Sequence, residues 1–393
     1  MSKEPGINEK GLLRSGRIME MDNQDRIYMA RAIEIARQGR GYVNPNPQVG
    51  AVIVKDGRII GEGAHLLCGS LHAERNAISN LTESAEGATI YVTLEPCCHH
   101  GKQPPCTEAL VENKIAKVVI GSRDPNPQVS GKGTKFLREH GIEVIENFMR
   151  EECDELNPIF FHYITTGMPY VAIKYAMTID GKIATKTGAS RWVTGEEARK
   201  HVHTLRGRYA CIMAGIGTVL ADDPLLNCRE EGGHQPVRVI CDTQLRIPMD
   251  SQIVKTAGEY RTIVACGSVT GSETIREKKK ALEADGNEVL SHEGDEGRIS
   301  MKELLTELGK MKLDSVFVEG GGEIHDALLR TGLANHLYAY VALKIFGSRD
   351  AKSPVGGTGV ALPSEAAMLK NMNITKFGDD ILIEGDFASG FVK

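Results

Sequence analysis

The sequence lacks a concentrated basic block: its 47 Lys and Arg are outnumbered by 52 Asp and Glu, for a formal net charge of −5. A protein that binds nucleic acid through its phosphates carries a basic patch or stripe. We therefore expect no nucleic-acid partner. The one basic cluster, at 276–280, lies in a helical stretch of mixed charge and is interpreted as a solvated helix face.

The sequence also lacks an apolar run of membrane length, a secretory signal region and a disulfide pattern. Its nine cysteines are an odd number, which is typical of a reducing compartment where thiols serve metal or core. We expect a cytoplasmic protein without membrane association. Five cysteines show no ligand spacing and are interpreted as small buried or surface residues: Cys153, Cys211, Cys228, Cys241 and Cys266.

The length of 393 residues allows two or three domains, and we favour two. A helical pattern ends near 165–169, where a new strand begins. We therefore expect one domain over 23–167 and a second over 168–393. Residues 1–22 contain several glycines and charges without sustained periodicity, and we expect them to form a flexible N-terminal extension.

Alternation of strands and helices favours an α/β fold with a mixed sheet in the first domain. A β-hairpin is expected over 51–60, and helices near 106–113 and 133–140 separate strands over 90–94, 118–120 and 142–144. The second domain repeats the alternation. Its strands are expected at 170–175, 210–214, 237–241, 262–265, 315–319, 337–341 and 381–383.

The most informative motif is His72-Ala73-Glu74, followed downstream by Cys97 and Cys106. One imidazole and two thiolates can hold zinc and leave a fourth position for water, whose pKa the metal lowers toward neutrality. Glu74 would stay off the metal and carry a proton from this water to a leaving amine, as in zinc deaminases. We therefore interpret His72, Cys97 and Cys106 as metal ligands and Glu74 as a catalytic residue.

A closed structural zinc site is the alternative, since enough ligands exist without Glu74: Cys97, Cys98, His99, His100 and Cys106. The cysteine spacing departs from the P-C-x-x-C of zinc deaminases, because eight residues separate the two thiolates. We expect this loop to contact substrate. We also expect Cys106 to lie at the start of a helix, which favours a thiolate, and Cys98 to face away from the metal.

A second candidate site follows the strand at 315–319, where Gly320-Gly321-Gly322 leads into a helix at 323–330. A strand, a glycine turn and a helix N-terminus together let backbone N–H groups approach a phosphate. The pattern is not the G-x-G-x-x-G fingerprint. A simple tight turn is the alternative.

Several long motifs resemble the RibD family of bifunctional riboflavin-biosynthesis deaminase/reductases. They occur in the family's order and include Asn44-Pro45-Asn46-Pro47-Gln48-Val49-Gly50, His72-Ala73-Glu74, Glu95-Pro96-Cys97-Cys98-His99-His100-Gly101-Lys102, Pro105-Cys106, Asp124-Pro125-Asn126-Pro127, Asp180-Gly181 and Gly188-Ala189-Ser190-Arg191-Trp192. The resemblance implies a cytidine-deaminase-like three-layer α/β/α domain followed by a dihydrofolate-reductase-like α/β domain. Cys98 departs from the family, where serine is common, so which sulfur binds the metal stays open.

The resemblance also implies residue roles. In the first domain the pyrimidine and its ribose phosphate would contact Asn46, His65, His99, Lys102, Asp124 and Asn126. In the second, NADPH would contact Ala176, Trp192, Thr218, Asp222, Thr243, Gly321, Gly322, Glu323, Ile324, His325, Asp326 and Ala327, and the phosphorylated sugar Lys174, Ser190, Arg206, Leu226, Arg229 and Glu319. His99 as a plain loop residue, and Arg206 and Arg229 as surface ion pairs, are the alternatives.

By this resemblance the chain would deaminate a 2,5-diaminopyrimidinone that carries a phosphoribosylamino group and then reduce its ribosyl group. The expected cofactors are one Zn²⁺ per chain and NADPH, the expected partner is the small phosphoribosyl pyrimidine, and we expect a homo-oligomer. Two rivals stay open. One is a zinc deaminase that edits nucleosides, nucleotides or tRNA, and the other is a scaffold with structural zinc.

Overall fold

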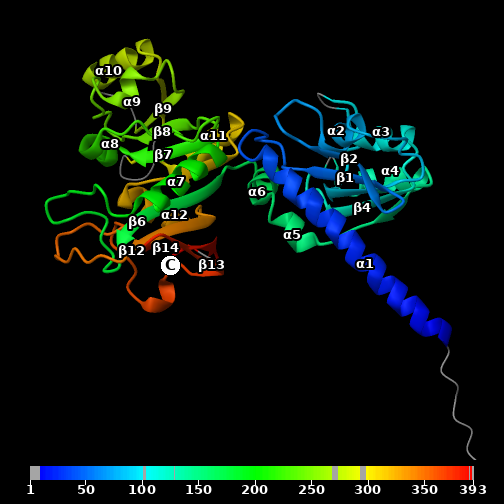
Figure 1. Ribbon diagram of the computed structural model, residues 1–393. Coiled ribbons are helices and arrows are strands. Elements are labelled where there is room, and N and C mark those ends of the chain that lie inside the picture. Colours follow the sequence, from blue (N-terminus) through cyan, green and yellow to red (C-terminus); the bar gives the residue numbers. More distant parts are fainter. Residues whose placement is uncertain are drawn as a thin grey trace, which may run out of the picture. The chain divides into compact units, whose positions relative to one another are not determined.

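The computed structural model describes residues 9–100, 103–127, 129–267, 273–292, 298–388 and 390–391, with side chains from residue 23 onward (Figure 1). The chain divides into two compact units, Met1–Thr165 and Thr166–Lys393. The division falls at 165/166, close to the 167/168 boundary expected from the sequence pattern. Each unit has its own sheet.

The first unit is built on a mixed sheet of strand order β2-β1-β3-β4-β5. β1 (Gly50–Lys55) pairs antiparallel with β2 (Arg58–Ala64) and β3 (Thr89–Leu94), whereas β4 (Lys117–Ser122) and β5 (Glu143–Ile145) continue in parallel. The expected hairpin and strands are thus confirmed. β1, β3 and β4 are buried almost throughout, because helices cover both faces of the sheet.

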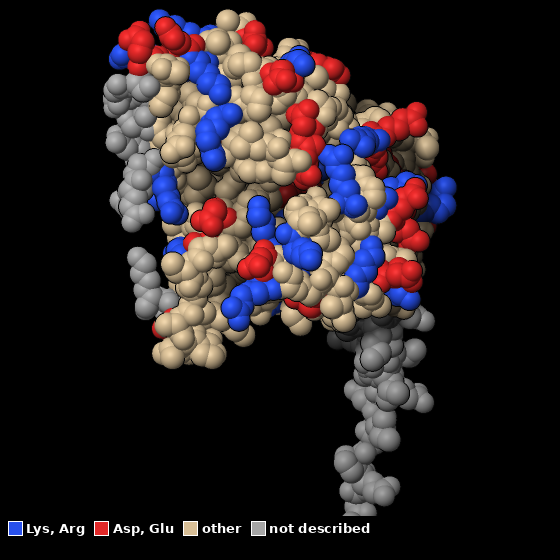
Figure 2. Space-filling model, turned by 90° about the vertical axis from the view of Figure 1, so that its left-hand side faces the viewer, with Lys and Arg blue, Asp and Glu red and all other residues tan. Residues whose placement is uncertain are grey.

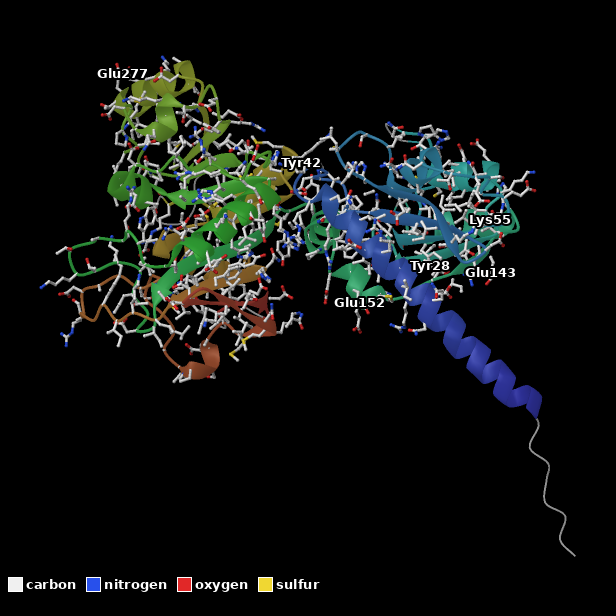
Figure 3. The ribbon with its side chains drawn as sticks, in the orientation of Figure 1. Tyr28, Tyr42, Lys55, Glu143, Glu152 and Glu277 are labelled. Carbon is white, nitrogen blue, oxygen red and sulfur yellow. The ribbon has the colours of Figure 1, made fainter. Side chains whose placement is uncertain are left out.

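The helices of this unit form two layers: α1 (Glu9–Ala36), α2 (Ala73–Ser79), α3 (Cys106–Glu112), α4 (Lys132–Glu139), α5 (Arg150–Asp154) and α6 (Pro158–Thr166), with a short 3-10 helix η1 (Arg37–Gly39). On one face α1 and α5 pack against Val52 and Tyr91, and Tyr28 of α1, labelled in Figure 3, lies 5.3 Å from the Tyr91 ring. On the other face α2, α3 and α4 pack against Ile53 and Ile90. Alternate strand residues therefore supply the two cores.

The second unit has a sheet of nine strands in the order β10-β9-β8-β7-β11-β6-β12-β14-β13. All neighbours are parallel except β12/β14 and β14/β13, which are antiparallel. The strands are β6 (Tyr170–Thr178), β7 (Cys211–Gly215), β8 (Val237–Cys241), β9 (Thr262–Cys266), β10 (Glu288–Ser291), β11 (Ser315–Val318), β12 (His336–Ala342), β13 (Leu369–Phe377) and β14 (Asp380–Phe387).

Helices cover both faces of this sheet as well: α7 (Glu196–Arg208), α8 (Ile216–Asp222), α9 (Gln252–Lys255), α10 (Glu273–Ala284), α11 (Met301–Lys310) and α12 (Gly322–Thr331), with the 3-10 helix η3 (Pro363–Glu365) in a loop. Leu308 of α11 and Leu328 of α12 pack against Met213 on one face. Leu282 of α10 packs against Ile212 on the other. The side chains of β7 thus alternate between two helical layers.

Three elements, α1, β10 and β13, differ from the sequence-based expectation. α1 begins at Glu9, so residues 9–22, which we expected to lack regular structure, are helical. They contain no proline, and Gly11 and Gly16 weaken a helix by only about 1 kcal/mol each without ending it. β10 and β13 were not expected, and they are the two edge strands of the sheet. β10 has four residues, of which Val289 alone is fully buried, and β13 is mostly exposed, so neither sequence shows a clear apolar pattern.

Surface and helix properties bear on possible partners. On the face shown in Figure 2, the described Lys and Arg side chains are interspersed with Asp and Glu. Within the described part of the chain, no helix has both the length and the apolar character needed to cross a membrane.

Candidate functional site

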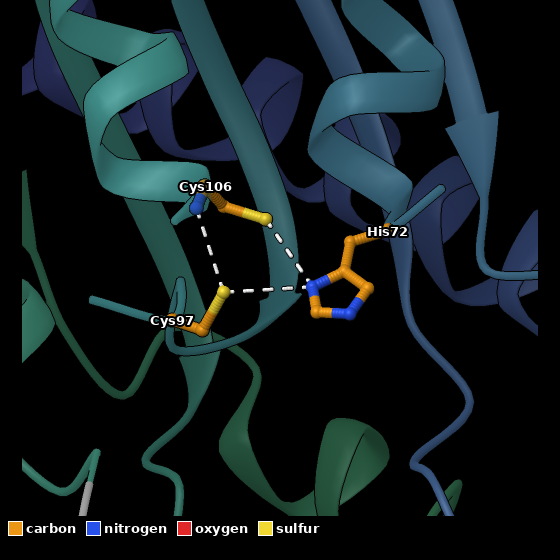
Figure 4. Close-up of side chains that lie close together, drawn as sticks. All are labelled: His72, Cys97 and Cys106. Carbon is orange, nitrogen blue, oxygen red and sulfur yellow. Dashed lines mark hydrogen bonds between the residues drawn. The ribbon is translucent and has the colours of Figure 1, made fainter. Parts of the chain in front are cut away.

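In the first unit, His72, Cys97 and Cys106 lie together although they are distant in sequence (Figure 4). The His72 Nδ1 atom lies 3.5 Å from the Cys97 Sγ atom and 3.4 Å from the Cys106 Sγ atom. All three potential ligand atoms fall within 4.8 Å of one another. His72 immediately precedes α2 and Cys106 is the first residue of α3. The expectation that Cys106 lies at the start of a helix is confirmed.

The fold holds the two sulfurs together through short backbone contacts. Cys97 follows the carboxyl end of β3, and its carbonyl accepts hydrogen bonds from the Thr107 N–H at 3.2 Å and the Thr107 hydroxyl at 3.3 Å. The Cys106 N–H points at the Cys97 Sγ atom at 3.4 Å. The first turn of α3 is therefore anchored to the end of β3, despite the long loop between the two cysteines.

These donors suit a zinc ion in both spacing and charge. Tetrahedral zinc with ordinary Zn–S and Zn–N bonds separates a sulfur from a nitrogen by about 3.6 Å, close to the two observed distances. Hydrogen bonds from Cys106 and His72 lower the pKa of Cys97 to about 4. The hydrogen bond between the two cysteines raises the pKa of Cys106. Two adjacent thiolates repel each other, so both cysteines ionise together only when a divalent cation compensates their charge.

Glu74 lies in the first turn of α2 and its side chain is buried. Burial raises the pKa of the Glu74 carboxyl, and the charge of Cys97 raises it further. The carboxyl is not among the three grouped ligand atoms. A buried carboxyl with a raised pKa beside a metal can both accept and release a proton near neutral pH.

His65 and Asn46 form a pair beside this cluster. The His65 Nδ1 atom lies 3.0 Å from the Leu71 carbonyl, which can only accept, so Nδ1 carries the proton. The opposite nitrogen, Nε2, then accepts from the Asn46 amide at 3.3 Å. Burial lowers the pKa of His65, and its ring packs edge-on against the His72 ring at 5.3 Å. The pair is thus fixed as a neutral imidazole and an oriented amide.

Of the other expected contacts, Asp124 and Asn126 lie just beyond the carboxyl end of β4, the strand next to β3. Asp124 is buried and accepts the Asn126 N–H at 2.8 Å. Burial raises the pKa of Asp124 to about 6. His99 is exposed and makes no hydrogen bond within the described residues, and Lys102 lies outside the described residues.

Glu95 is a buried side chain whose role the sequence did not reveal. Its carboxylate accepts the Gly131 N–H at 3.0 Å and the Thr134 N–H at 3.3 Å, so it caps the N-terminus of α4 from β3. The α4 helix has no cap of its own because its N-cap residue is glycine. Glu95 belongs to the motif that contains Cys97. Its capping role could not be predicted, because its partners lie more than thirty residues away in the sequence.

The second unit contains a cleft of about 880 Å³. It lies where the neighbouring parallel strands β7, β11 and β6 direct their carboxyl ends, the usual location of ligand sites in such sheets. Thirteen of the expected contacts line it: Lys174, Ala176, Ser190, Trp192, Arg206, Thr218, Asp222, Leu226, Arg229, Glu319, Gly321, Gly322 and His325.

Five expected cofactor contacts lie outside the lining of this cleft: Thr243, Glu323, Ile324, Asp326 and Ala327. Thr243 follows β8, one strand beyond β7, and its carbonyl accepts the Gly267 N–H at 3.0 Å. Asp326 instead forms an ion pair with Arg330 at 2.8 Å. The structure therefore places the expected glycine turn in the cleft but turns part of the following helix away from it.

Three charged side chains meet deep in the cleft. Arg206 donates to both carboxylate oxygens of Glu319, with Nη2 at 2.9 Å from Oε2, and the Lys174 Nζ atom lies 3.7 Å from Oε2. Burial alone would raise the pKa of Glu319, but the charges of Arg206 and Lys174 outweigh it and lower that pKa. Arg206 thus forms a buried ion pair rather than the surface pair considered from sequence. Its fork faces Glu319, which leaves fewer donors for a phosphate.

The glycine turn after β11 brings backbone close to the cleft. Gly321 has φ +96°, a conformation that favours glycine, and a Cβ atom on Gly320 would lie 3.0 Å from the Thr218 hydroxyl. α12 begins directly after this turn, so its first N–H groups lack partners within the helix. These features fit the phosphate groups of a dinucleotide, and the cleft volume suits a cofactor.

His203 also lines the cleft, although the sequence gave no reason to single it out. Its Nδ1 atom accepts the Arg229 N–H at 3.3 Å. Burial, with the nearby charges of Arg206 and Arg229, lowers the pKa of His203 to about 4. A neutral imidazole therefore lies between two guanidinium groups.

Comparison with known proteins agrees with both sites. Residues 22–122 match the family described as the cytidine and deoxycytidylate deaminase zinc-binding region, and residues 169–383 match the RibD C-terminal domain. The riboflavin biosynthesis protein RibD of Actinobacillus pleuropneumoniae is 50% identical over 357 residues, which cover 91% of this chain and 94% of that protein. RibD of Escherichia coli (strain K12) is 38% identical over 374 residues, with coverage of 92% and 98%.

Solved structures give the same result for the whole chain. Acinetobacter baumannii RibD, form 2, matches with a TM-score of 0.82 at 35% identity, covering 94% of this chain and 100% of that one. The diaminohydroxyphosphoribosylaminopyrimidine deaminase/5-amino-6-(5-phosphoribosylamino)uracil reductase from Thermotoga maritima matches with a TM-score of 0.80 at 39% identity, with the same coverage.

The fold and the two sites define a class of enzyme in which a deaminase domain with a zinc-binding region precedes a reductase domain. The expected fold class is confirmed. The chain belongs to the RibD family of bifunctional deaminases and reductases in riboflavin biosynthesis. This assignment implies zinc and a nicotinamide cofactor.

Proposed function

We propose that this chain deaminates 2,5-diamino-6-(5-phosphoribosylamino)pyrimidin-4(3H)-one and then reduces the ribosyl group of the resulting 5-amino-6-(5-phosphoribosylamino)uracil to ribityl. The observation that carries the first step is the grouping of His72, Cys97 and Cys106 beside the buried Glu74. The name of the Thermotoga maritima relative supports the substrates of both steps.

In the deaminase unit, His72 Nδ1 and the two sulfurs would hold one Zn²⁺ per chain. When bound, zinc supplies a water with a pKa near neutrality. The Glu74 carboxyl takes a proton from the attacking water and delivers it to the amine that leaves as ammonia. Asn46, His65, His99, Lys102, Asp124 and Asn126 would bind the pyrimidine and its ribose phosphate.

Neutral His65 and the Asn46 amide suit a polar heterocycle, because the amide orientation is fixed by a hydrogen bond that the imidazole accepts. Asp124 sits at the neighbouring strand end, where a carboxylate can accept hydrogen bonds from ring amino groups. These contacts orient the carbon bearing the 2-amino group toward Glu74. Orientation of this kind lowers the barrier by removing motion from the reactants.

In the reductase unit, NADPH, when bound, would provide the hydride that reduces the first carbon of the opened sugar. The cofactor would lie along the turn from Gly321 into α12, with further contacts from Ala176, Trp192, Thr218, Asp222, Thr243, Gly322, Glu323, Ile324, His325, Asp326 and Ala327. Lys174, Ser190, Arg206, Leu226, Arg229 and Glu319 would hold the sugar phosphate. The exposed Arg229 guanidinium, rather than the Arg206 fork, suits the phosphate best.

Lys174 is the proton donor that the geometry favours for this step. Burial lowers the pKa of Lys174, although Glu319 opposes the shift. A lysine with a lowered pKa releases its proton more readily. The Lys174 Nζ atom, held near Glu319, can deliver that proton to the sugar as its ring opens.

The test follows ammonia and NADPH together in one assay of purified protein with the diaminopyrimidinone phosphate. We expect ammonia to appear first and NADPH to be oxidised only as deaminated product accumulates. Release of ammonia from cytidine or tRNA but not from this substrate would favour the editing alternative. Oxidation of NADPH by dihydrofolate instead of the sugar phosphate would contradict the reductase assignment.

A further inference from the structure

Arg75, the residue after Glu74, reaches across to the loop between the two cysteines. Its Nε atom donates to the Pro104 carbonyl at 3.0 Å, and its Nη2 atom donates to the Pro105 carbonyl at 2.7 Å. Pro105 directly precedes Cys106 and is the N-cap residue of α3. One guanidinium on α2 therefore donates hydrogen bonds to both residues that immediately precede Cys106.

This contact helps to place Cys106, whose position the long loop alone would not fix. In a P-C-x-x-C arrangement the second cysteine is placed by the turn that carries the first, whereas here eight residues intervene. Proline has no N–H to donate, so the only backbone groups through which Pro104 and Pro105 can be held are their carbonyls. Arg75 uses both, in a planar two-point contact that lysine cannot reproduce.

The other contacts of the loop leave its approach to Cys106 less constrained. The Gln103 amide donates to the Gly69 carbonyl at 3.3 Å, and Thr107 lies one residue beyond the thiolate with its bonds to the Cys97 carbonyl. Only Arg75, among the described residues, joins α2 to the diproline segment by charged hydrogen bonds. Such bonds are roughly twice as strong as neutral ones.

We propose that Arg75 is a positioning residue that fixes Cys106 relative to His72 by holding the carbonyls of Pro104 and Pro105. In this role Arg75 acts through the segment before Cys106. It keeps the imidazole and the second sulfur at ligand spacing across two separate helices. The inference rests on the proposed zinc centre, and it adds to that centre a residue that positions one of its ligands.

The experiment compares zinc release from the full-length, zinc-loaded protein in wild-type form, Arg75→Met and Arg75→Lys. Zinc transfer to excess chromophoric chelator is timed, and deamination and NADPH-dependent reduction are assayed on the same samples. Loss of a direct hydrogen-bond partner of a metal ligand costs about 10- to 100-fold in affinity or activity, and Arg75 holds the residues next to a ligand, so we expect the lower end of this range. We expect Arg75→Met to release zinc about 10-fold faster and Arg75→Lys to release it faster than wild type.

The matched control is Arg58→Met on β2. Arg58 is an exposed arginine of the same unit that pairs with Glu83 at 3.1 Å and does not contact the loop. We expect it to release zinc at the wild-type rate. Reductase activity in the same chains should stay constant, which excludes general misfolding, and Arg75→Gln replaces the methionine variant if the latter does not fold.

Wild-type zinc retention in Arg75→Met would overturn the proposal. Wild-type retention in Arg75→Lys, with rapid release in Arg75→Met, would also overturn it, because charge rather than the two carbonyl contacts would then hold the metal. Failure of the wild-type protein to bind zinc at all would instead refute the metal centre in "Proposed function", and the wild-type measurement reveals that separately.

Discussion

The two sites of this chain are built in opposite ways. In the first unit, three ligand atoms lie within 4.8 Å of one another, and the buried Glu74 follows His72 by two residues in the first turn of α2. In the second unit, a cleft of about 880 Å³ collects residues from many segments, and its central ion pair joins Arg206 to Glu319 across 113 positions. A metal needs donors in near contact, whereas a cofactor that carries the hydride needs mainly shape and charge from the protein.

This difference predicts how each site should respond to the replacement of a single side chain. Each side chain of the compact site serves deamination directly, as a metal ligand or as the proton carrier, so a single replacement should abolish or strongly reduce that one activity. In the cleft the charged groups compensate one another, so a replacement should disturb stability together with activity. Because both sites belong to one chain, each activity serves as the control for the other.

The largest effect is expected from the two neighbouring cysteines. Cys97→Ser should lose bound zinc and all deamination, whereas Cys98→Ser should keep both, because Cys98 lies outside the grouped ligand atoms. The measurements are metal content per chain and ammonia release. A Cys98 variant that lost its zinc would show that the other sulfur is the ligand.

A slightly smaller effect is expected from Glu74→Gln, which removes the proton carrier without changing the size of the side chain. General acid–base catalysis contributes on the order of 10²- to 10⁴-fold, so deamination should fall by about that factor. Zinc content and the reductase rate should match the wild-type values. Native-rate deamination by this variant would exclude Glu74 from the reaction.

In the cleft, Glu319→Gln should weaken both structure and reduction. The replacement leaves Arg206 and Lys174 buried without their anion, and breaking a buried ion pair costs about 3–5 kcal/mol. The exposed pair between Arg261 and Glu288 supplies the control, because Glu288→Gln should change stability by about 1 kcal/mol or less. Thermal unfolding and the Michaelis constant for the sugar phosphate measure the two effects, and equal results for both variants would contradict the buried-pair interpretation.

The smallest effect is expected from Asp124→Asn, and it depends on pH. The pKa of Asp124 is raised from 3.8 to about 6, so the folded state binds this proton more tightly than the unfolded state. Ionised Asp124 therefore costs stability above pH 6, at most about 3 kcal/mol, and the cost disappears below pH 3.8.

Asp124→Asn should accordingly stabilise the first unit by about 1–2 kcal/mol at pH 7.5, with a smaller gain at pH 4.5, while weakening deamination. Such an exchange of stability for activity is common at functional sites. Melting temperatures at the two pH values measure it. A gain in stability that grew toward acidic pH would contradict a raised pKa for Asp124.

The same contrast decides how much could be predicted from sequence. His72, Glu74, Cys97 and Cys106 could be predicted as site residues because each occurs in a short motif whose residue types suit a catalytic zinc. Most of the parallel strands were predicted because burial on both faces gives continuous apolar runs. The edge strands β10 and β13 gave no such run, and α1 continued to Glu9 because nothing in the sequence stops it.

Contacts between distant segments could not be predicted in this way. Nothing near Glu95 indicates that it caps α4, and nothing near Arg206 indicates that its fork faces Glu319. Likewise, nothing near Arg75 in the sequence indicates that it donates to the carbonyls of Pro104 and Pro105. These roles depend on the three-dimensional path of the chain, which local propensity and spacing do not specify.

The anchoring of both sulfurs has a consequence for how the family can diversify. Cys97 follows the end of a strand and Cys106 is the first residue of a helix, and Arg75 holds Pro104 and Pro105 at the end of the segment that joins them. The residues of this segment that precede the two prolines can therefore be gained, lost or exchanged while the sulfurs stay at ligand spacing. Selectivity for new heterocycles could therefore evolve in this loop without rebuilding the centre that performs the hydrolysis.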